Sequence, residues 1–384
     1  MKAAVTRIET ARPGALAFVL IEGGQVSDTH FRSADQPVDA DTLFQVASMS
    51  KWVTAWGVMT LVQDGKLDLD APVSTYLTRW SLPPSEFDNR QVTVRRLLSH
   101  TAGLTDGLGY GGFAPGRPVQ SIEASLTRAA DASPNAEGVV RVGIEPGSGF
   151  EYSGGGYTLL QLIIEEVSGQ DFNAYMKQRV LAPLGMKRST FDVDADKAAN
   201  LAGFYDVDGD PAIHYRFTAR AAASLYTSAA DMTRFLQAHW PGPSGQPVGR
   251  GVLSAQTLKT MRQPHAAQFG ADIWGLGTVL YAPNNRGDFI IGHDGSNDPA
   301  INTSARLDPD TGDGVIVLES GDRLLATAVA GEWVFWNTGN VDILMLTMEA
   351  GTLLKTLVAG WIAILAAAAF MVWRSKRGAR RPPA

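Results

Sequence analysis

The first residues that could carry out chemistry together are a serine and a lysine in the segment Ser48-Met49-Ser50-Lys51. The segment lies at the predicted start of a helix, where side chains three residues apart share a face. A serine hydroxyl becomes a nucleophile when a base takes its proton, and a lysine amine can act as that base once burial lowers its pKa. The flanking residues are apolar, so we expect the pair to face a cleft; a chance S-x-x-K on a solvated helix is the alternative.

Two further segments combine glycine with residues that can transfer protons. The sequence EYSGGGY at 151–157 precedes a helical pattern at 157–168, and by itself it indicates an ordinary glycine loop. It is not a phosphate loop, because no Lys-Ser/Thr follows it. The sequence HDGS at 293–296 follows an apolar strand predicted at 288–291, and alone it indicates the end of a strand with a hydrogen-bonded histidine.

In this order, the three segments resemble the serine β-lactamase and penicillin-recognising superfamily, specifically its class C-like branch of esterases, D-aminopeptidases and DD-carboxypeptidases. The stretches between them are also similar to that family, for example DTLFQVASMSK, VRRLLSHTAGL and EPGSGFEYSGGGYTLL. The resemblance covers about residues 13–337. It implies hydrolysis of a small ester, amide or β-lactam through an acyl-enzyme, with no metal and no cofactor. A matched motif specifies fold and site more firmly than substrate.

The resemblance also implies a role for each matching residue. Ser48 would be the nucleophile, and Lys51 would be its base or the group that keeps Tyr152 poised. Tyr152 would pass a proton to the leaving group and later activate water. The backbone N–H groups of Ser48 and Ser296 would form the oxyanion hole, and Gly295 would lie beside the bound substrate.

At two positions the sequence departs from the pattern of the family. Gly154 occupies a substrate-binding position where the usual Tyr-x-Asn has an asparagine, so the side-chain amide that would bind Lys51 or an acyl-amide oxygen is missing. His293, which we count among the catalytic residues, stands where β-lactamases and carboxypeptidases of the superfamily usually carry lysine. Its charge depends on pH, since free histidine has a pKa of about 6.5, so it would hold a substrate carboxylate less firmly.

Both departures favour esterase or amidase/D-peptidase-type activity on a small acyl substrate. A true β-lactamase is the alternative, on family membership. A protein of a different class, a non-turnover penicillin-binding sensor or binding module that acylates once or only docks a partner, is the third interpretation; the intact Ser48, Lys51 and Tyr152 argue against a dead site.

Three other features have weaker interpretations. His100, in LLSHTAGL, matches a hallmark of the family that we interpret as structural, at a helix end. The residues Ala221-Ala222-Ala223 stand where relatives often have paired glycines, with no functional interpretation. The sequence DVDGD at 206–210 hints at a calcium loop, but Phe217 stands where such a loop needs glutamate, which favours a hairpin turn.

Strand patterns lie at both ends of the body, and helical patterns fill residues 48 to about 240. The predicted strands are 15–22, 25–31, 274–281, 288–291, 301–307 and 314–319, with a closing helix at 323–336. We therefore expect an α+β fold of the DD-peptidase/β-lactamase type. One antiparallel sheet would be built from both chain ends, flanked by helices, with an inserted helical lobe and a site between the two.

The composition excludes several classes of protein. The chain has 384 residues, of which 45% are hydrophobic and 19% charged, so it is not a disordered chain. It has no cysteine, which excludes disulfides, thiolate metal sites and a cysteine nucleophile. The net charge of −6 argues against a nucleic-acid partner.

The end of the chain predicts a membrane anchor. Residues 356–373 are 18 uncharged, mostly apolar residues, which as a helix would reach about 27 Å, and a basic cluster follows. We expect a hydrolase domain at 1–340, a transmembrane helix at 353–373 and a basic cytoplasmic tail at 374–384. The positive-inside rule then places the body in the periplasm or outside the cell. No signal-peptide pattern is visible at the N-terminus, so either the true start lies upstream, which we favour, or the body is cytoplasmic and the tail inserts against the rule.

Overall fold

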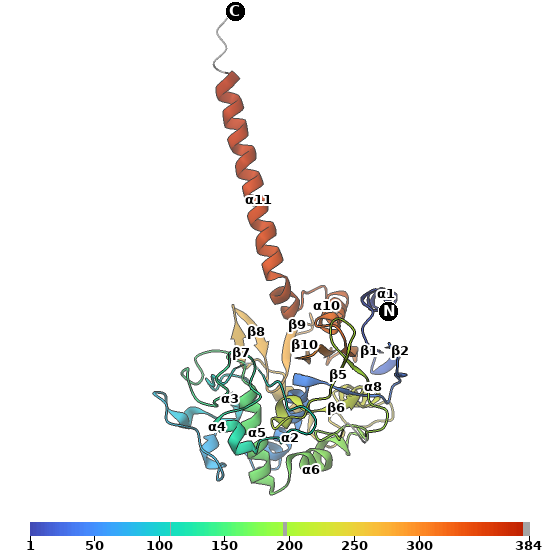
Figure 1. The fold of residues 1–384 in the computed structure, drawn as a ribbon, viewed down its shortest axis with the longest axis vertical. Helices are drawn as coiled ribbons and strands as arrows, with labels where there is room; N and C mark the ends of the chain where they lie inside the picture. The colour runs from blue at the N-terminus through green and yellow to red at the C-terminus, as the bar shows by residue number, and fades with distance from the viewer. Residues whose placement is uncertain (108, 195–197, 379–384) are drawn as a thin grey trace, which may run out of the picture.

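Both ends of the body contribute strands to one antiparallel sheet, as the sequence predicts (Figure 1). The computed structural model describes residues 1–107, 109–194 and 198–378. Within them the main sheet has the strand order β2-β1-β12-β11-β10-β9-β8-β7. Its strands are β1 Ala15–Glu22, β2 Gln25–Ser33, β7 Ala266–Gln268, β8 Ala271–Trp274, β9 Val279–Pro283, β10 Phe289–Asn297, β11 Ile301–Leu307 and β12 Gly314–Ser320. Because β1 pairs with β12, the two ends of the body meet inside the sheet.

The middle of the chain forms a mainly helical lobe on one side of this sheet (Figure 1). Its helices are α2 Ser50–Gln63, α3 Val94–Leu98, α4 Ile122–Thr127, α5 Gly154–Ser168, α6 Phe172–Met176, α7 Arg220–Ala223, α8 Ala229–Gln237 and α9 Ala255–Met261. Short turns are η1 Ala47–Met49, η2 Val73–Thr75, η3 Asn89–Gln91 and the π-helical η4 Lys177–Leu181. Two small strand pairs complete the lobe, β3 Leu43–Gln45 with β6 Tyr226–Ser228, and β4 Phe204–Tyr205 with β5 Pro211–Ala212.

The two faces of the sheet pack against different layers. In β1, Ala17 and Val19 belong to the large core that the helical lobe shares, whereas Leu16 and Phe18 belong to a second core on the other face. Helices α1 Lys2–Ala11 and α10 Leu325–Thr338 cover that second face. Alternate residues of a strand point to opposite faces, so a strand buried on both sides is apolar along its buried part, as β1 is up to the exposed Glu22 at its end.

Helix α2 runs through the middle of the large core. Its apolar residues are buried on every side, because it packs against the sheet as well as against α5 and α7. The helix ends at a glycine suited to this place, since Gly65 adopts a left-handed conformation with a φ of +70° directly after the C-cap. The start of α2 is therefore held rigidly at the junction of the sheet and the lobe.

The hairpin turn predicted at 206–210 is confirmed, and the start of α8 also follows a local sequence pattern. Ser228 accepts a hydrogen bond from the backbone N–H of Asp231 at 3.2 Å and caps α8, as the Ser-x-x-Asp spacing predicts. The DVDGD segment forms a hairpin turn between β4 and β5, in which Asp206 Oδ1 accepts from the N–H groups of Asp208 and Asp210 at 2.9 and 3.0 Å.

Two strand predictions are wrong in ways that bear on the site. The predicted strand at 274–281 is two strands, β8 and β9, joined by a turn in which Gly277 has a φ of +79°. A Cβ on Gly277 would lie 2.2 Å from the Cβ of Ala55, so the turn is pressed against α2. The strand predicted at 288–291 continues to Asn297, so the HDGS sequence lies inside β10 and not at its end.

The chain ends in one long helix, α11 Ile343–Gly378, which extends away from the body (Figure 1). Its segment Lys355–Arg374 has a mean hydropathy of 2.1 and buries none of its surface in the body. By length and composition this segment could cross a membrane, and it overlaps the span predicted at 353–373. The basic tail was predicted at 374–384; residues 374–378 belong to α11, and residues 379–384 lie outside the described residues.

Candidate active site

Ser48 and Lys51 face each other where the helical lobe meets the sheet. The turn η1, which carries Ser48, contacts α7 on one side and β10 on the other. Lys51 Nζ lies 3.0 Å from Ser48 Oγ and donates a second hydrogen bond, of 2.9 Å, to the carbonyl oxygen of Ala222. Lys51 is only 2% exposed, whereas Ser48 is half-buried and can be reached by a substrate. The predicted pairing of the two side chains is confirmed.

The backbone beside Ser48 has a strained conformation, and hydrogen bonds hold it in place. Ala47 has a φ of +43°, which is uncommon for a residue with a Cβ and persists only where the surroundings enforce it. Ser50 Oγ donates to the carbonyl oxygen of Ala47 at 2.5 Å and accepts from the N–H of Leu225 at 2.9 Å. The turn between β3 and α2 is thus tied to the segment that leads into β6.

Tyr152 lies beside Lys51, as the resemblance to the family implies. The Lys51 ammonium is 5.0 Å from the centre of the Tyr152 ring, and the ring of His100 stacks on the same ring at 4.3 Å. The following residue, Ser153, caps α5 by accepting from the N–H of Gly156 at 2.8 Å. The tyrosine therefore projects from the loop that opens α5.

A buried carboxylate anchors this loop. Asp106 accepts hydrogen bonds from the Ser153 hydroxyl and, at 2.6 Å, from the N–H of Gly155. Burial raises the pKa of Asp106, and these two donors act in the opposite direction by favouring the charged form. The sequence carried no signal for this residue, because its partners are more than forty positions away in the chain.

His100 stacks against the ring of Tyr152. It follows the C-cap of α3 with a φ of +56°, which agrees with its predicted place at a helix end. Its Nδ1 accepts from the N–H of Ser153 at 3.1 Å, so the ring is neutral with its proton on Nε2. Burial first, and then the charge of Lys51, lower the pKa of His100 well below its ordinary value. His100, which the sequence indicated as a structural residue, is thus in direct contact with Tyr152 of the site.

His293 projects from β10 toward the same place. Its Nδ1 donates to the carbonyl oxygen of Asp294 at 2.6 Å, which leaves Nε2 as an unprotonated acceptor that has no partner among the described residues. Burial first, and then the charge of Lys51, lower the pKa of His293 to about 4. The indole of Trp274 contacts the rings of both His100 and His293 edge-on.

The predicted oxyanion segment lies against the Ser48 turn. A Cβ on Gly295 would be 2.1 Å from the carbonyl oxygen of Val46, so only glycine allows β10 to approach this closely. Thr303 of the neighbouring strand donates to the same Val46 oxygen at 3.1 Å. Ser296 is exposed and pairs with Asn302 of β11. Its role in an oxyanion hole stays a prediction.

The space beside Gly154 is filled. A Cβ on Gly154 would lie 2.9 Å from Cε2 of Tyr110, whose ring is buried and whose hydroxyl accepts from Thr158 at 3.1 Å. Asn297, at the end of β10, donates to the carbonyl oxygen of Tyr110 at 3.3 Å. An aromatic ring therefore occupies the place into which an asparagine side chain at position 154 would extend.

An antiparallel sheet with an inserted helical lobe, and a serine, a lysine and a tyrosine gathered where the two meet, define the serine β-lactamase and penicillin-recognising superfamily. The sequence model of one family, described as Beta-lactamase, matches residues 1–333, and the chain belongs to this family. It is a serine hydrolase of the class C-like branch.

The similar proteins include both penicillin-binding proteins and an esterase. The chain is 30% identical over 308 residues to penicillin-binding protein 4 of Amycolatopsis lactamdurans, which covers 76% of each protein. It is 31% identical over 190 residues to esterase EstB of Burkholderia gladioli, which covers 47% of this chain and 46% of the esterase. Among solved structures, the octameric penicillin-binding protein homologue of Pyrococcus abyssi superposes with a TM-score of 0.70 at 26% identity, covering 88% of this chain and 77% of that one.

Proposed function

We propose that the protein hydrolyses small esters or amides, including D-peptide-type bonds, through an acyl-enzyme on Ser48. The observation that carries the proposal is the 3.0 Å contact between Ser48 Oγ and the buried Lys51 amine, next to Tyr152. A buried amine adjacent to a hydroxyl is an arrangement that can activate a serine nucleophile. The ring of Tyr152 has its centre 5.0 Å from the same amine, and a tyrosine hydroxyl in such a site can move protons during the reaction.

Each step in this mechanism uses one of these groups. Ser48 Oγ attacks the carbonyl carbon while its proton passes to Lys51 or Tyr152, and the carbonyl oxygen becomes an oxyanion that the N–H groups of Ser48 and Ser296 stabilise. As the tetrahedral intermediate collapses, Tyr152 gives the proton to the leaving alcohol or amine. Water then attacks the acyl-enzyme, gives its proton to Tyr152, and Ser48 leaves with a proton to release the acid.

The chemistry around the site favours substrates without a carboxylate. Because the pKa of His293 is about 4, its ring is neutral at pH 7 and lacks the positive charge that a lysine would offer, while its Nε2 is buried and has no hydrogen-bond partner among the described residues. At position 154 no side-chain amide is present, and Tyr110 fills the space. Both features support ester or simple amide hydrolysis over β-lactam hydrolysis, and the resemblance to an esterase agrees with this.

We further propose that α11 anchors the protein in a membrane, with the body on the periplasmic or extracellular side. The apolar segment Lys355–Arg374 supports this, because it is exposed along its whole length and basic residues follow it. A hydrolase held in this way would act on substrates that reach the membrane surface from outside the cytoplasm.

The experiment that tests the activity compares two substrates on the full chain in detergent. Turnover of p-nitrophenyl butyrate and of a chromogenic cephalosporin is measured for the wild type, for Ser48→Ala and for Ser27→Ala, a control on the exposed edge strand β2. We expect ester turnover to exceed cephalosporin turnover, and Ser48→Ala alone to abolish both turnover and labelling by a fluorophosphonate. Dominant cephalosporin turnover would support a β-lactamase instead, and a burst without steady turnover would support a sensor.

A further inference from the structure

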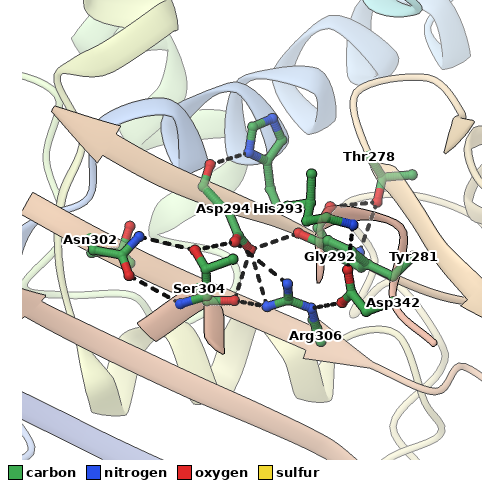
Figure 2. Close-up of polar contacts among 12 residues, drawn as sticks. Thr278, Tyr281, Gly292, His293, Asp294, Asn302, Ser304, Arg306 and Asp342 are labelled. Carbon is green, nitrogen blue, oxygen red and sulfur yellow. Dashed lines mark hydrogen bonds and ion pairs between the residues drawn. The ribbon is translucent and has the colours of Figure 1, made fainter. Parts of the chain in front are cut away.

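The strand that carries His293 is held from its opposite face by a buried polar cluster (Figure 2). Neighbouring residues of a strand point to opposite faces, so Asp294 points away from the site that His293 faces. The Asp294 carboxylate accepts hydrogen bonds from the hydroxyl groups of Tyr281 at 2.8 Å, Ser304 at 2.8 Å and Thr327 at 2.7 Å. Three elements besides β10 therefore meet at this one carboxylate, namely β9, β11 and α10.

A fully buried arginine links this carboxylate to a second one. Arg306 of β11 places Nη1 3.1 Å from Asp294 Oδ1 and Nε 2.7 Å from Asp342 Oδ2, and its guanidinium group lies 4.0 Å from the centre of the Tyr281 ring. The side chains of Arg306 and Asp342 have no exposed surface. Charges buried in this way depend on one another, because each would be costly without its partner.

Asp342 stands at the base of α11. Its Oδ1 accepts from the N–H of Leu344 at 2.7 Å, so it caps the first turn of that helix while its Oδ2 binds Arg306. Ile343 and Leu344 also pack on an apolar cluster that contains Trp274 and touches Tyr152. The first residues of α11 are thus joined to the site by one polar route and one apolar route.

The polar route ends at the histidine. The carbonyl oxygen of Asp294 accepts from Nδ1 of His293, so the residue that binds Arg306 through its side chain also fixes the orientation and the proton of the His293 ring through its backbone. On the face of β10 that is turned toward the site, Gly295 packs directly against the carbonyl oxygen of Val46, so β10 cannot move closer to the Ser48 turn.

We propose that Asp342 is a positioning residue which, through Arg306 and Asp294, holds β10 so that His293 and Gly295 lie correctly against Ser48. The inference rests on the proposed function for its catalytic consequence, and on the geometry of the buried cluster for its structural one. It makes the base of the C-terminal helix a part of the support of the active site. A small displacement of the reacting groups slows the chemical step strongly. We therefore expect the loss of Asp342 to lower kcat more than it changes KM.

The test uses the full chain in detergent and three variants. Asp342→Asn keeps an oxygen that can cap α11 but removes the charge that binds Arg306. Thr327→Val keeps the shape but removes one donor to Asp294, and serves if Asp342→Asn does not fold. Asp288→Asn is the matched control, because Asp288 binds Arg262 at 2.6 Å just before the far end of the same strand.

We expect Asp342→Asn to lower kcat for p-nitrophenyl butyrate about tenfold with KM within about twofold, Thr327→Val to lower kcat about threefold, and Asp288→Asn to change neither. Hydrogen exchange at the amides of residues 293–297 is measured alongside, and should become about tenfold faster in Asp342→Asn and not in the control. Unchanged kcat and unchanged exchange in Asp342→Asn and Thr327→Val would overturn the proposal, as would a change in KM alone. A wild type without Ser48-dependent turnover would overturn the proposed function, while the exchange measurement would still decide the positioning role.

Discussion

Gly295 passes so close to Val46 that a Cβ on the glycine would lie 2.1 Å from the valine carbonyl oxygen. This contact sets the distance between β10 and the turn that carries Ser48. The approach has two consequences, one for the stability of the fold and one for catalysis, and a single added methyl group tests both.

Gly295→Ala is expected to lower the free energy of unfolding by about 1–3 kcal/mol, because the methyl group forces β10 and the Ser48 turn apart. Ester turnover should fall roughly 100-fold, since the displaced groups no longer align. Denaturant unfolding and steady-state kinetics measure the two effects. Gly149→Ala is the control, because an added Cβ there meets none of the described residues within 4 Å. Equal turnover in the two variants would contradict the prediction.

Lys51→Met should separate catalysis from stability. Removing the amine takes away the group in contact with Ser48 Oγ, so we expect kcat/KM to fall by about 100- to 10,000-fold. Replacing a buried amine with an apolar chain of similar length costs little, so the free energy of unfolding should stay within about 1 kcal/mol of the wild type. Lys66→Met, at an exposed position just after the end of α2, should leave both unchanged. A large loss of stability in Lys51→Met would show that the lysine is structural.

The sequence predicted this pair because its geometry is local. Ser48 and Lys51 are three residues apart at the start of α2, so helix geometry alone brings them to one face. The second bond of the lysine could not be predicted in this way, since the Ala222 carbonyl is 171 positions away. The Ala221-Ala222-Ala223 segment, which had no functional interpretation, turns out to supply that carbonyl.

The strand β10 shows why some elements escaped prediction. Its sequence HDGSN contains polar residues and glycine, which are typical of a turn, and the predicted strand therefore stopped at residue 291. The polar residues lie within the strand because His293 faces the site and Asp294 faces Arg306 of the neighbouring strand. Partners of this kind are set by the tertiary fold, and no local pattern reveals them.

Gly154→Asn introduces the asparagine that is usual in the family, but we expect that this asparagine does not restore the family's role in substrate binding. The new side chain would meet the Tyr110 ring, which the Cβ position already approaches to 2.9 Å, so we expect a loss of about 1–3 kcal/mol in the free energy of unfolding. Cephalosporin turnover should not rise. The double variant Gly154→Asn with Tyr110→Ala frees the space, and only this combination should increase cephalosporin turnover. A rise in the single variant would mean that Tyr110 does not block the position.

A charge placed in the apolar segment of α11 tests the proposed membrane anchor. Leu365→Arg places a charge within Lys355–Arg374, which costs about 3 kcal/mol at the centre of a membrane helix. We expect the wild-type chain to stay with the membrane fraction after alkaline extraction and the variant to be partly released. Ile213→Arg, a control at an exposed apolar residue of the body, should remain with the wild type. Release of the wild type itself would contradict the proposed anchor.

The depressed pKa of His293 predicts how stability depends on pH. Burial holds this pKa at about 4 in the folded protein, against about 6.5 when unfolded, so between these values the unfolded chain binds the extra proton. Stability rises with pH wherever the unfolded state binds more protons. The contribution of His293 is therefore fully present above pH 6.5 and is lost as the pH falls toward 4, by about 3 kcal/mol in all.

Other buried groups shift in the same or the opposite sense, so the test is a difference between two proteins. His239 has a pKa of about 4 as well, whereas burial raises the pKa of Asp106. Denaturant unfolding of the wild type and of His293→Asn is followed from pH 7 to pH 4. The variant should lose less free energy of unfolding over this range than the wild type does, because an asparagine takes up no proton when the chain unfolds. Parallel curves for the two proteins would show that His293 has the same pKa in the folded and the unfolded chain, and the lowered pKa that supports the proposed preference for esters would then be contradicted.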